Sequence, residues 1–420
     1  MKTHILSCLG ISLSVLSIPS AKALTSAGVW DSPAAAPTIN RMIAAPKKAE
    51  RVTKVNQAPR QARHPKTNMA VAPQSNGQNG QPINKINPKN QTIPVTHAAK
   101  TPPPPAANPK ANFRYDFFSP YVSWGIDPDD PQLSVNLKAA WANFEQKKDV
   151  VVAIIDTGID YNHPFVRDNI IVKEGIKGPQ NYGVDFAAGR KNATTPNDDN
   201  GHGTHVAGII RSVFPNVKLL VLKYYNPQAS GQANVDSTVA AFQYAVDKKV
   251  DIINYSGGGP EFVAEEKAAI EKAVKEGILV VAAAGNEASD IDLKSNNYFP
   301  ASYGLPNIIA VTAYNQQLNI MPLSNYGKHS VHLAAPGHRI RSSFPNGRSG
   351  YLTGTSQATA FVSGAAALIK AQHPELSNDR LKDLLVSQTD LLPAFVGKTT
   401  SGGKLDTSKA MAEAKVVPRH

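Results

Sequence analysis

The sequence predicts an α/β fold, a three-layer sandwich in which helices cover both faces of a mostly parallel sheet. Two observations lead to this prediction. From residue 113 onward, short runs rich in Val, Ile and Leu alternate with stretches of helical length. These runs are apolar at successive positions, which is typical of parallel strands buried on both faces. No internal repeat is evident along the chain.

Residues 1–112 precede this pattern and are predicted to form no core. Lys2, an apolar run over residues 5–18 and the small residues Ala21 and Ala23 predict a secretory signal peptide over residues 1–23, cleaved after Ala23. The apolar run is too short to span a membrane comfortably. Residues 24–112 are basic and rich in Pro, Asn and Gln, so we expect a disordered leader or pro-region.

Charge and cysteine content exclude several classes of protein. The net charge of the chain is +12. Residues 1–112 hold 14 basic residues (Lys and Arg) and 2 acidic residues (Asp and Glu), whereas the rest of the chain holds 30 basic and 30 acidic residues. The predicted domain, residues 113–420, is therefore neutral, and nothing in it indicates nucleic acid as a partner. Cys8 is the only cysteine and lies in the signal peptide, which excludes disulfides and thiolate chemistry from the mature chain. We expect a secreted or periplasmic protein with no integral membrane segment after signal removal.

The elements of the predicted domain follow one another in a regular order. The apolar β-branched run at residues 150–155 ends in a turn of Asp and Gly and predicts the first buried strand. Further strands are predicted over residues 218–223, 250–254, 278–283, 308–312 and 331–333, and helices over residues 137–141, 206–213, 235–247, 262–276 and 379–387. Another helix begins near Ser356. Its surface is mostly Ala and Gly, which predicts a buried central helix.

Polar residues follow several predicted strands at their carboxyl ends. Asp156 ends the first strand, residues 254–259 (NYSGGG) follow a later one, and Asn286 comes directly after Ala284 and Gly285. Ligands of open parallel sheets bind beyond the carboxyl ends of the strands. These residues are therefore expected to share one edge of the sheet.

Ser356 and this edge together contain the parts that acyl transfer requires. A serine at the start of a helix lies near unpaired N–H groups and the positive end of the helix dipole. Acyl transfer also needs a base, an acid that orients the base, and donors for the oxyanion. The candidate bases are His202 and His205, and the candidate acids are Asp156 and Asp160. Each residue taken singly has an ordinary explanation as a cap or turn residue.

Three segments resemble the subtilisin-like serine proteases, or subtilases. They are residues 152–160 (VAIIDTGID), 200–208 (NGHGTHVAG) and 354–359 (GTSQAT), in the order Asp, His, Ser. The resemblance implies that Asp156 is the acid, His202 the base and Ser356 the nucleophile. It also implies that Asn286 and the backbone N–H of Ser356 bind the oxyanion. The expected function is that of a secreted serine endopeptidase acting through an acyl-enzyme.

The resemblance also implies a substrate cleft. Two edge segments are expected to pair with an extended peptide, since backbone pairing supplies affinity in such complexes. These segments are Ser230, Gly231 and Gln232, and Ser256, Gly257 and Gly258. The primary pocket is expected to be formed by Ala283, Ala284, Gly285 and Tyr298. Because Tyr298 partly fills this pocket and no acidic residue lies there, small to medium apolar side chains are the expected substrates.

The chain departs from the family pattern at several positions. Gln357 stands where a methionine is usual, and Ala360 where a proline is usual. The stretch between His205 and Leu222 is too short for the calcium loop of many relatives, and Phe165 replaces a common aspartate ligand. We therefore expect no required cofactor, while a weak structural calcium site remains possible around the aspartates Asp290 and Asp292.

Two other functions fit the same residues. The altered surroundings of Ser356 motivate a catalytically inactive binding protein with the subtilase fold, and acyl chemistry alone would also fit an esterase-type hydrolase. The complete set of catalytic groups favours proteolysis. The expected partners are protein or peptide substrates, and the expected oligomeric state is a monomer.

Overall fold

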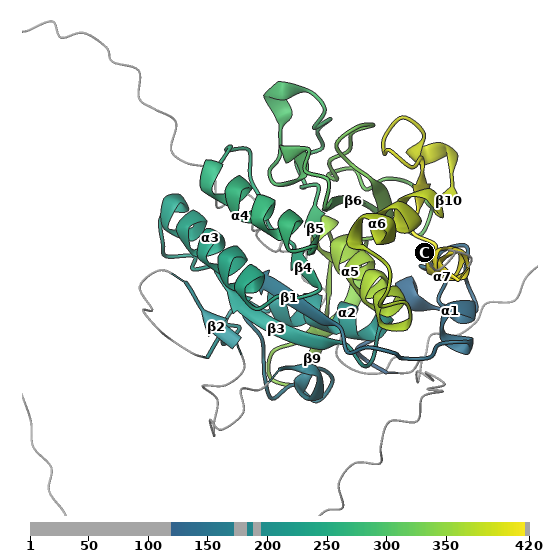
Figure 1. Cartoon of the computed structure of the whole chain (residues 1–420), viewed down its shortest axis with the longest axis horizontal. Helices are drawn as coiled ribbons and strands as arrows, with labels where there is room; N and C mark the ends of the chain where they lie inside the picture. The colour runs from purple at the N-terminus through teal and green to yellow at the C-terminus, as the bar shows by residue number, and fades with distance from the viewer. Residues whose placement is uncertain (1–118, 172–182, 188–194, 416–420) are drawn as a thin grey trace, which may run out of the picture. The chain divides into compact units, whose positions relative to one another are not determined.

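The computed structural model describes residues 119–171, 183–187 and 195–415. The predicted signal peptide and leader lie outside them. Within the described part of the chain, nine strands form one sheet in the order β10-β11-β7-β6-β5-β4-β1-β3-β2 (Figure 1). All neighbouring pairs are parallel except β10 with β11, so the predicted mostly parallel sheet is confirmed. The strands are β1 (Val151–Asp156), β2 (Gly183–Asp185), β3 (Lys218–Lys223), β4 (Ile252–Tyr255), β5 (Leu279–Ala283), β6 (Ile308–Tyr314), β7 (Leu333–Pro336), β10 (Asp390–Leu391) and β11 (Gly403–Lys404).

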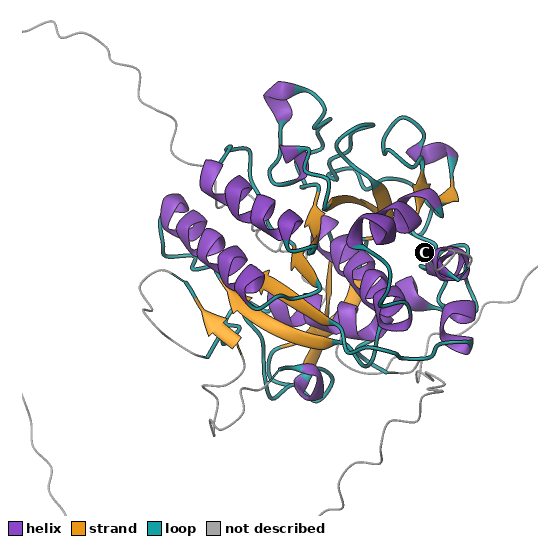
Figure 2. Cartoon of the chain, viewed as in Figure 1, coloured by secondary structure: helices purple, strands orange, loops and turns teal. Residues whose placement is uncertain are grey.

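Helices cover both faces of this sheet (Figure 2). They are α1 (Lys138–Ala142), α2 (His202–Val213), α3 (Gly231–Asp247), α4 (Ala264–Lys275), α5 (Thr355–Gln372), α6 (Asn378–Ser387) and α7 (Thr407–Ala414). Alternate residues of β1 belong to two different cores. Val152 and Ile154 pack in the core that contains residues of α2 and α5, whereas Ala153 and Ile155 pack in the core that contains residues of α3 and α4. The three-layer sandwich is therefore confirmed.

Helix α5 is the buried central helix that its Ala-rich sequence predicts. Every residue of α5 except Lys370 is buried. Glycine allows it to approach α2 closely, since a Cβ on Gly364 would lie 2.6 Å from the Cβ of Val213. Small residues at this crossing bring α2 and α5 close together. Helix α2 begins with His202, and α5 begins with Thr355 and Ser356.

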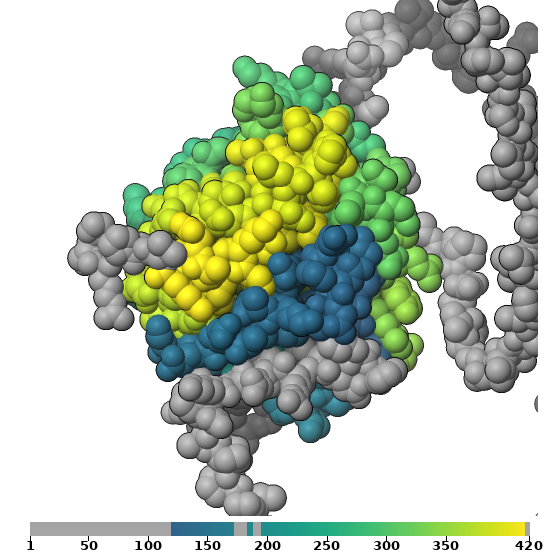
Figure 3. Space-filling model, turned by 90° about the vertical axis from the view of Figure 1, so that its right-hand side faces the viewer, coloured from purple at the N-terminus to yellow at the C-terminus, as the bar shows by residue number. Residues whose placement is uncertain are grey.

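The two ends of the described domain are joined to each other. Helix α1 packs against α7, and Figure 3 shows this N-terminal part in blue beside the yellow C-terminal helices. The Ser408 hydroxyl donates to the carbonyl of Asn136 at 2.6 Å and accepts from the N–H of Ala140 at 3.2 Å. None of the helices in the described ranges is both long and apolar enough to span a bilayer.

The structure differs from the sequence-based elements mainly at their ends. Helix α2 begins at His202, four residues earlier than predicted. Gly201, with a φ of 102°, and Asp198, which caps the first turn, set this start, and the prediction from apolar periodicity did not include them. The predicted strand at 331–333 is displaced to β7. The hairpin β8 (Ile340–Phe344) with β9 (Arg348–Leu352) and the C-terminal elements β10, β11 and α7 were not predicted. Most positions of β9 are partly or fully exposed, so it lacks the buried apolar run of a parallel strand.

Candidate active site

The end of β1 and the start of α2 place a carboxylate against an imidazole. Asp156 is 3% exposed, and its Oδ1 lies 2.8 Å from Nδ1 of His202. The same oxygen accepts the N–H of Thr157 at 2.7 Å. Because the carboxylate occupies Nδ1, the other ring nitrogen of His202, Nε2, is the one available as a base.

The structure does not place the alternative acid and base in such a pair. His205 is fully buried, its Nε2 lies 2.9 Å from the carbonyl of Ile340, and burial lowers its pKa to about 3. It is a neutral core histidine. The carboxylate of Asp160 accepts backbone N–H groups from Asn162 and Asn346, so it orders a loop.

Competing effects set the pKa of His202. Burial is the largest single effect and lowers it, but the charge of Asp156, its hydrogen bond and the charge of Asp198 together raise it above 6.5. The surroundings therefore favour the imidazolium, which is the form that a base reaches when it has taken a proton from a nucleophile.

Asp198 organises the turn that carries His202, and sequence reasoning did not identify it. Its Oδ1 accepts the N–H of Gly201 at 2.7 Å and the hydroxyl of Thr157 at 2.8 Å. Its Oδ2 accepts the N–H of Thr204 at 2.8 Å and the hydroxyl of the same residue at 2.6 Å. A carboxylate at this position satisfies unpaired donors in the first turn of α2 and favours the helix dipole. The only sequence signal was an Asp four residues before His202, at a cap-like distance.

Ser356 begins α5 with its hydroxyl held by the neighbouring segment. Its Oγ donates to the carbonyl of Ser256 at 2.8 Å, and the hydroxyl of Ser256 donates back to the carbonyl of Ser356 at 3.1 Å. A serine has one hydroxyl proton, so in this rotamer it is directed to Ser256 and not to His202. Catalytic hydrogen bonds are often poorly aligned without substrate and form only in the complex with it. Acyl transfer therefore requires a rotation of the Ser356 side chain.

The orientation of the Asn286 amide is fixed by the start of α5. Its Oδ1 accepts the N–H of Thr355 at 3.0 Å and lies 3.3 Å from the hydroxyl of the same residue. A backbone N–H can only donate, so the amide oxygen faces Thr355 and the NH₂ group faces away from it. This leaves the Nδ2 donors of Asn286 for a group beside Ser356.

Asn325 holds the loop that carries Asn286, a role that the sequence did not suggest. Its Oδ1 accepts the N–H groups of Glu287 and Ser289 at 3.0 Å each. Its Nδ2 donates to the carbonyl of Ala284 at 2.9 Å. One buried amide thus replaces the regular backbone pairing that this loop lacks after β5 ends.

Tyr298, part of the predicted primary pocket, lies between Gly285 of that pocket and Gly258 of the neighbouring edge segment. A Cβ on Gly258 would lie 2.5 Å from Cε1 of Tyr298, and a Cβ on Gly285 would lie 2.9 Å from its Cδ2. The tyrosine is 2% exposed, and Ala283 and Ala284 beside it are buried. The ring therefore occupies the space between Gly258 and Gly285.

The first of the two segments expected to pair with substrate lies at a helix start. Gly231 and Gln232 are the first residues of α3, and Ser230, with an extended backbone, is its N-cap. The Ser230 hydroxyl accepts the N–H of Ala233, a strong helix-start signal that outweighs the glycine. A helix leaves its first N–H groups without intrahelical acceptors, so this segment still presents donors. Ser256, Gly257 and Gly258 follow β4 without regular structure, and Gly259 pairs with Phe299.

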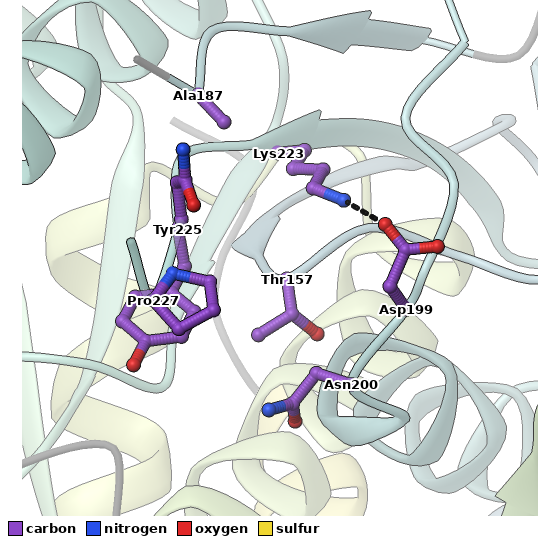
Figure 4. A pocket seen from close by; sticks show the side chains of 8 residues that line it. Thr157, Ala187, Asp199, Asn200, Lys223, Tyr225 and Pro227 are labelled. Atoms are coloured by element: carbon purple, nitrogen blue, oxygen red, sulfur yellow. Dashed lines mark hydrogen bonds and ion pairs between the residues drawn. The ribbon is translucent and has the colours of Figure 1, made fainter. Parts of the chain in front are cut away.

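A small hollow of about 110 Å³ adjoins the pair of Asp156 and His202. Thr157, which follows Asp156, and Asn200, whose Oδ1 accepts the N–H of His202 at 3.3 Å, line it (Figure 4). Lys223 is 5% exposed in its wall, and its Nζ lies 3.2 Å from Oδ2 of Asp199. The ion pair keeps the ammonium charge in this wall compensated.

The departures near Ser356 change its surroundings without removing a catalytic group. Gln357 is 2% exposed, and its Nε2 has no hydrogen-bond partner in the described part of the chain. Ala360 is fully buried in α5. Neither residue breaks the helix that carries the serine.

The regions considered for calcium differ in their contacts. Helix α2 is continuous, and the guanidinium of Arg211 stacks over the ring of Phe165 at 4.0 Å. Asp292 accepts N–H groups from His329 and Ser330 at 2.9 and 2.8 Å; burial acts to raise its pKa, but these bonds outweigh it and lower the pKa. Among the described residues, no group of three or more His, Cys, Asp or Glu is placed to hold a metal. The weak calcium site remains a prediction.

Comparison with known proteins agrees with this geometry. A family model described as the subtilase family, Peptidase_S8, matches residues 147–411. The chain belongs to the subtilase family. It is 38% identical over 302 residues to the major intracellular serine protease of Bacillus subtilis (strain 168), covering 67% of this chain and 90% of that protein. It is 36% identical over 252 residues to subtilisin E of the same organism, covering 58% of this chain and 61% of that protein. An intracellular serine protease of Paenibacillus polymyxa is 39% identical over 245 residues, or 56% of this chain and 71% of that protein.

Membership in this family makes the chain a serine-type endopeptidase, a hydrolase. The expected family and fold class are therefore confirmed. The Bacillus subtilis relative that matches over 302 residues is named as intracellular.

The influence of Asp198 on His202 can be measured directly. We expect Asp198→Asn to lower the pKa of His202, because it removes a negative charge that favours the imidazolium. NMR titration of the ring protons in a Ser356→Ala background reports this pKa. Asp199→Asn is the control, since Asp199 does not contribute to the raised pKa of His202. Equal midpoints in both variants and the parent would contradict the assignment.

Proposed function

We propose that the chain is a secreted endopeptidase that hydrolyses peptide bonds through an acyl-enzyme on Ser356. The observation that carries the proposal is the 2.8 Å contact between Nδ1 of His202 and the buried Asp156. It supplies an oriented base at the point where α2 and α5 pack together. The family supports proteolysis over the esterase and binding alternatives.

The residues act in two half-reactions. The Ser356 hydroxyl leaves the carbonyl of Ser256, turns to Nε2 of His202 and attacks the substrate carbonyl carbon while His202 takes its proton. The C–N bond then breaks as His202 gives that proton to the leaving amine. Water next enters, loses a proton to His202 and attacks the ester carbonyl carbon. The C–O bond to Ser356 then breaks, His202 returns the proton to Oγ, and the acid is released.

Two donors stabilise the tetrahedral intermediates. One is Nδ2 of Asn286, whose amide is oriented by Thr355. The other is the backbone N–H of Ser356 in the first turn of α5, where N–H groups have no intrahelical acceptor. The raised pKa of His202 keeps the base protonated at lower pH. Activity is therefore expected to rise with pH as this ring loses its proton.

The proposal is tested by hydrolysis of casein and of chromogenic peptides. We expect Ser356→Ala to reduce activity to background, and Asn286→Ala to lower kcat by about 10²–10³ with little change in KM, since the oxyanion donor acts mainly in the transition state. Background activity that is equal in parent and Ser356→Ala would contradict proteolysis by this site. Cleavage of small esters but of no peptide would favour the esterase alternative.

We propose that the primary pocket, formed by Ala283, Ala284, Gly285 and Tyr298, accepts small side chains. The ring of Tyr298 supports this, because it lies between Gly258 and Gly285. Two segments line the path of the peptide. One side is formed by Ser256, Gly257 and Gly258. The other side is the start of α3, with Ser230, Gly231 and Gln232.

Removing the Tyr298 ring is expected to enlarge the accepted side chain. In Tyr298→Ala, kcat/KM for peptides with Phe or Leu before the scissile bond should rise about tenfold relative to peptides with Ala, because the vacated space admits the larger group. Tyr298→Phe is the matched control, since it keeps the ring and should keep the preference. An unchanged ratio in Tyr298→Ala would contradict the role of the ring.

Location and maturation are also proposed on the sequence. A signal peptide over residues 1–23, export to the periplasm or beyond, and removal of the leader over residues 24–112 fit the composition of these stretches. N-terminal sequencing of the active protein is the test. A start at Leu24 or further along the leader supports export, whereas an active protein that retains Met1 contradicts it. No cofactor is required in this proposal, and the protein acts as a monomer on protein or peptide substrates.

A further inference from the structure

A second cavity, of about 330 Å³, lies beside the proposed peptide path. The start of α3 contributes Gly231 and Gln232, and the segment after β4 contributes Gly258 and Gly259. These are neighbours of the residues expected to contact substrate. The remaining lining residues are Tyr224, Asn234, Val235, Thr238, Tyr255, Glu261, Phe262, Val263, Glu266 and Phe299. Among the described residues of this lining, the only formal charges are those of the carboxylates of Glu261 and Glu266.

Glu266, near the start of α4, is the buried one of the two. It is 7% exposed, and its Oε2 accepts the hydroxyl of Tyr303 at 2.7 Å. No Lys, Arg or His among the described residues forms an ion pair with it. Glu265 is exposed in the same turn and already serves the helix dipole, so that role does not explain why Glu266 is buried.

A buried carboxylate without a cation is costly when ionised. Burial, the largest effect, raises the pKa of Glu266 to about 7, and the hydrogen bond from Tyr303 only partly offsets it. Other titratable groups near Glu266 bring no positive charge; they are Tyr224, Tyr255, Tyr298, Tyr303, Glu261 and Glu265. A bound cation would therefore supply the missing partner.

The shape of the cavity fits a long cationic side chain. Its walls include Phe262, Val263 and Phe299, which suit an aliphatic stem, while Glu266 suits an ammonium or guanidinium group. Glu261, exposed at the edge, adds negative charge and no competing cation. A free apolar ligand would leave the carboxylate unpaired.

We propose that Glu266 is a specificity-determining residue that binds a Lys or Arg side chain of the substrate, upstream of the scissile bond. This rests on the proposed function. The upstream side follows from the order of contacts along the segment after β4. Ser256 contacts Ser356, Gly258 lies beside the primary pocket and Gly259 lines the second cavity, so this cavity lies beyond the primary pocket as seen from the nucleophile. Tyr298 fills the primary pocket beside Gly258, and the next residue of each segment, Phe299 and Gly259, lines the second cavity. Gly259 and Phe299 exchange two backbone hydrogen bonds at 3.0 and 2.7 Å, which fixes this wall.

The test uses a set of fluorogenic peptides with Ala before the scissile bond. Lys, or its uncharged analogue norleucine, is placed in turn at each of the five positions before this Ala and at each of the three positions after the scissile bond. At about pH 8.5 the parent enzyme should cleave the Lys peptide about tenfold faster in kcat/KM at one upstream position, as expected for a charge-assisted bond. At about pH 5.5 the ratio should fall toward one, because Glu266 is then protonated.

Glu266→Gln separates charge from shape. We expect it to reduce the Lys to norleucine ratio to about one at both pH values, while cleavage of the norleucine peptide continues. Glu265→Gln is the control and should keep the parent's ratio. A folded-state pKa raised from 4.5 to about 7 means that Glu266 costs stability as pH rises through this range. In a Ser356→Ala background, Glu266→Gln should therefore unfold at no lower temperature than its parent at about pH 8.

The outcomes separate the two proposals. If the parent enzyme cleaves the norleucine peptides but shows no preference for Lys at any upstream position, the role of Glu266 is overturned. The proposed function is not affected by that result. A preference that survives in Glu266→Gln, or that appears only downstream, also overturns the role of Glu266. Parent enzyme that cleaves none of the peptides contradicts the proposed function itself.

Discussion

The candidate site depends on one contact, in which the last residue of a buried strand meets the first residue of a helix. The carboxylate of Asp156 can orient His202 only if β1 and α2 keep their relative position, and the surrounding bonds maintain it. Asp198 holds Thr157 on one side and the first turn of α2 on the other. The N–H of Gly203 in turn donates to the hydroxyl of Thr157 at 2.9 Å. Strand end and helix start are thus one hydrogen-bonded unit, and burial makes each bond in it count for more than it would at the surface.

Helix α5 connects this unit to the rest of the cleft. Its first turn carries Ser356, its Thr355 orients the amide of Asn286, and Ser363, further along the same helix, donates to Asn254 at 2.8 Å. Asn254 then donates to the hydroxyl of Ser256, which contacts Ser356. The proposed nucleophile, the proposed oxyanion donor and the expected substrate wall are therefore all hydrogen-bonded, directly or through Asn254, to the same helix. Precise placement of such groups is the main requirement of acyl transfer.

Much of the fold could be predicted because buried parallel strands are apolar at every position. The strand at 218–223 was predicted to the residue, and the central helix was evident from its small residues. Helix starts were less accessible, because Asp198 and Ser230 specify them through hydrogen bonds rather than through apolar periodicity. Motifs identified Asp156, His202, Asn286 and Ser356 as candidates. Asn325 and Glu266 act through contacts with segments distant in sequence, and no local pattern marks them. Asp198 contacts Thr157 as well as the nearby first turn of α2, and its spacing from His202 is its only local signal.

The central claim is that His202 and Asp156 activate Ser356 as the nucleophile. Its most direct test is the rate of covalent inactivation by a fluorophosphonate, with the adduct located by mass spectrometry of peptides. A single adduct on Ser356 is expected. In Asp156→Asn the inactivation rate should fall by about 10³–10⁴, because the imidazole loses its orienting carboxylate. An adduct on another serine, or an equal rate in Asp156→Asn, would contradict the account.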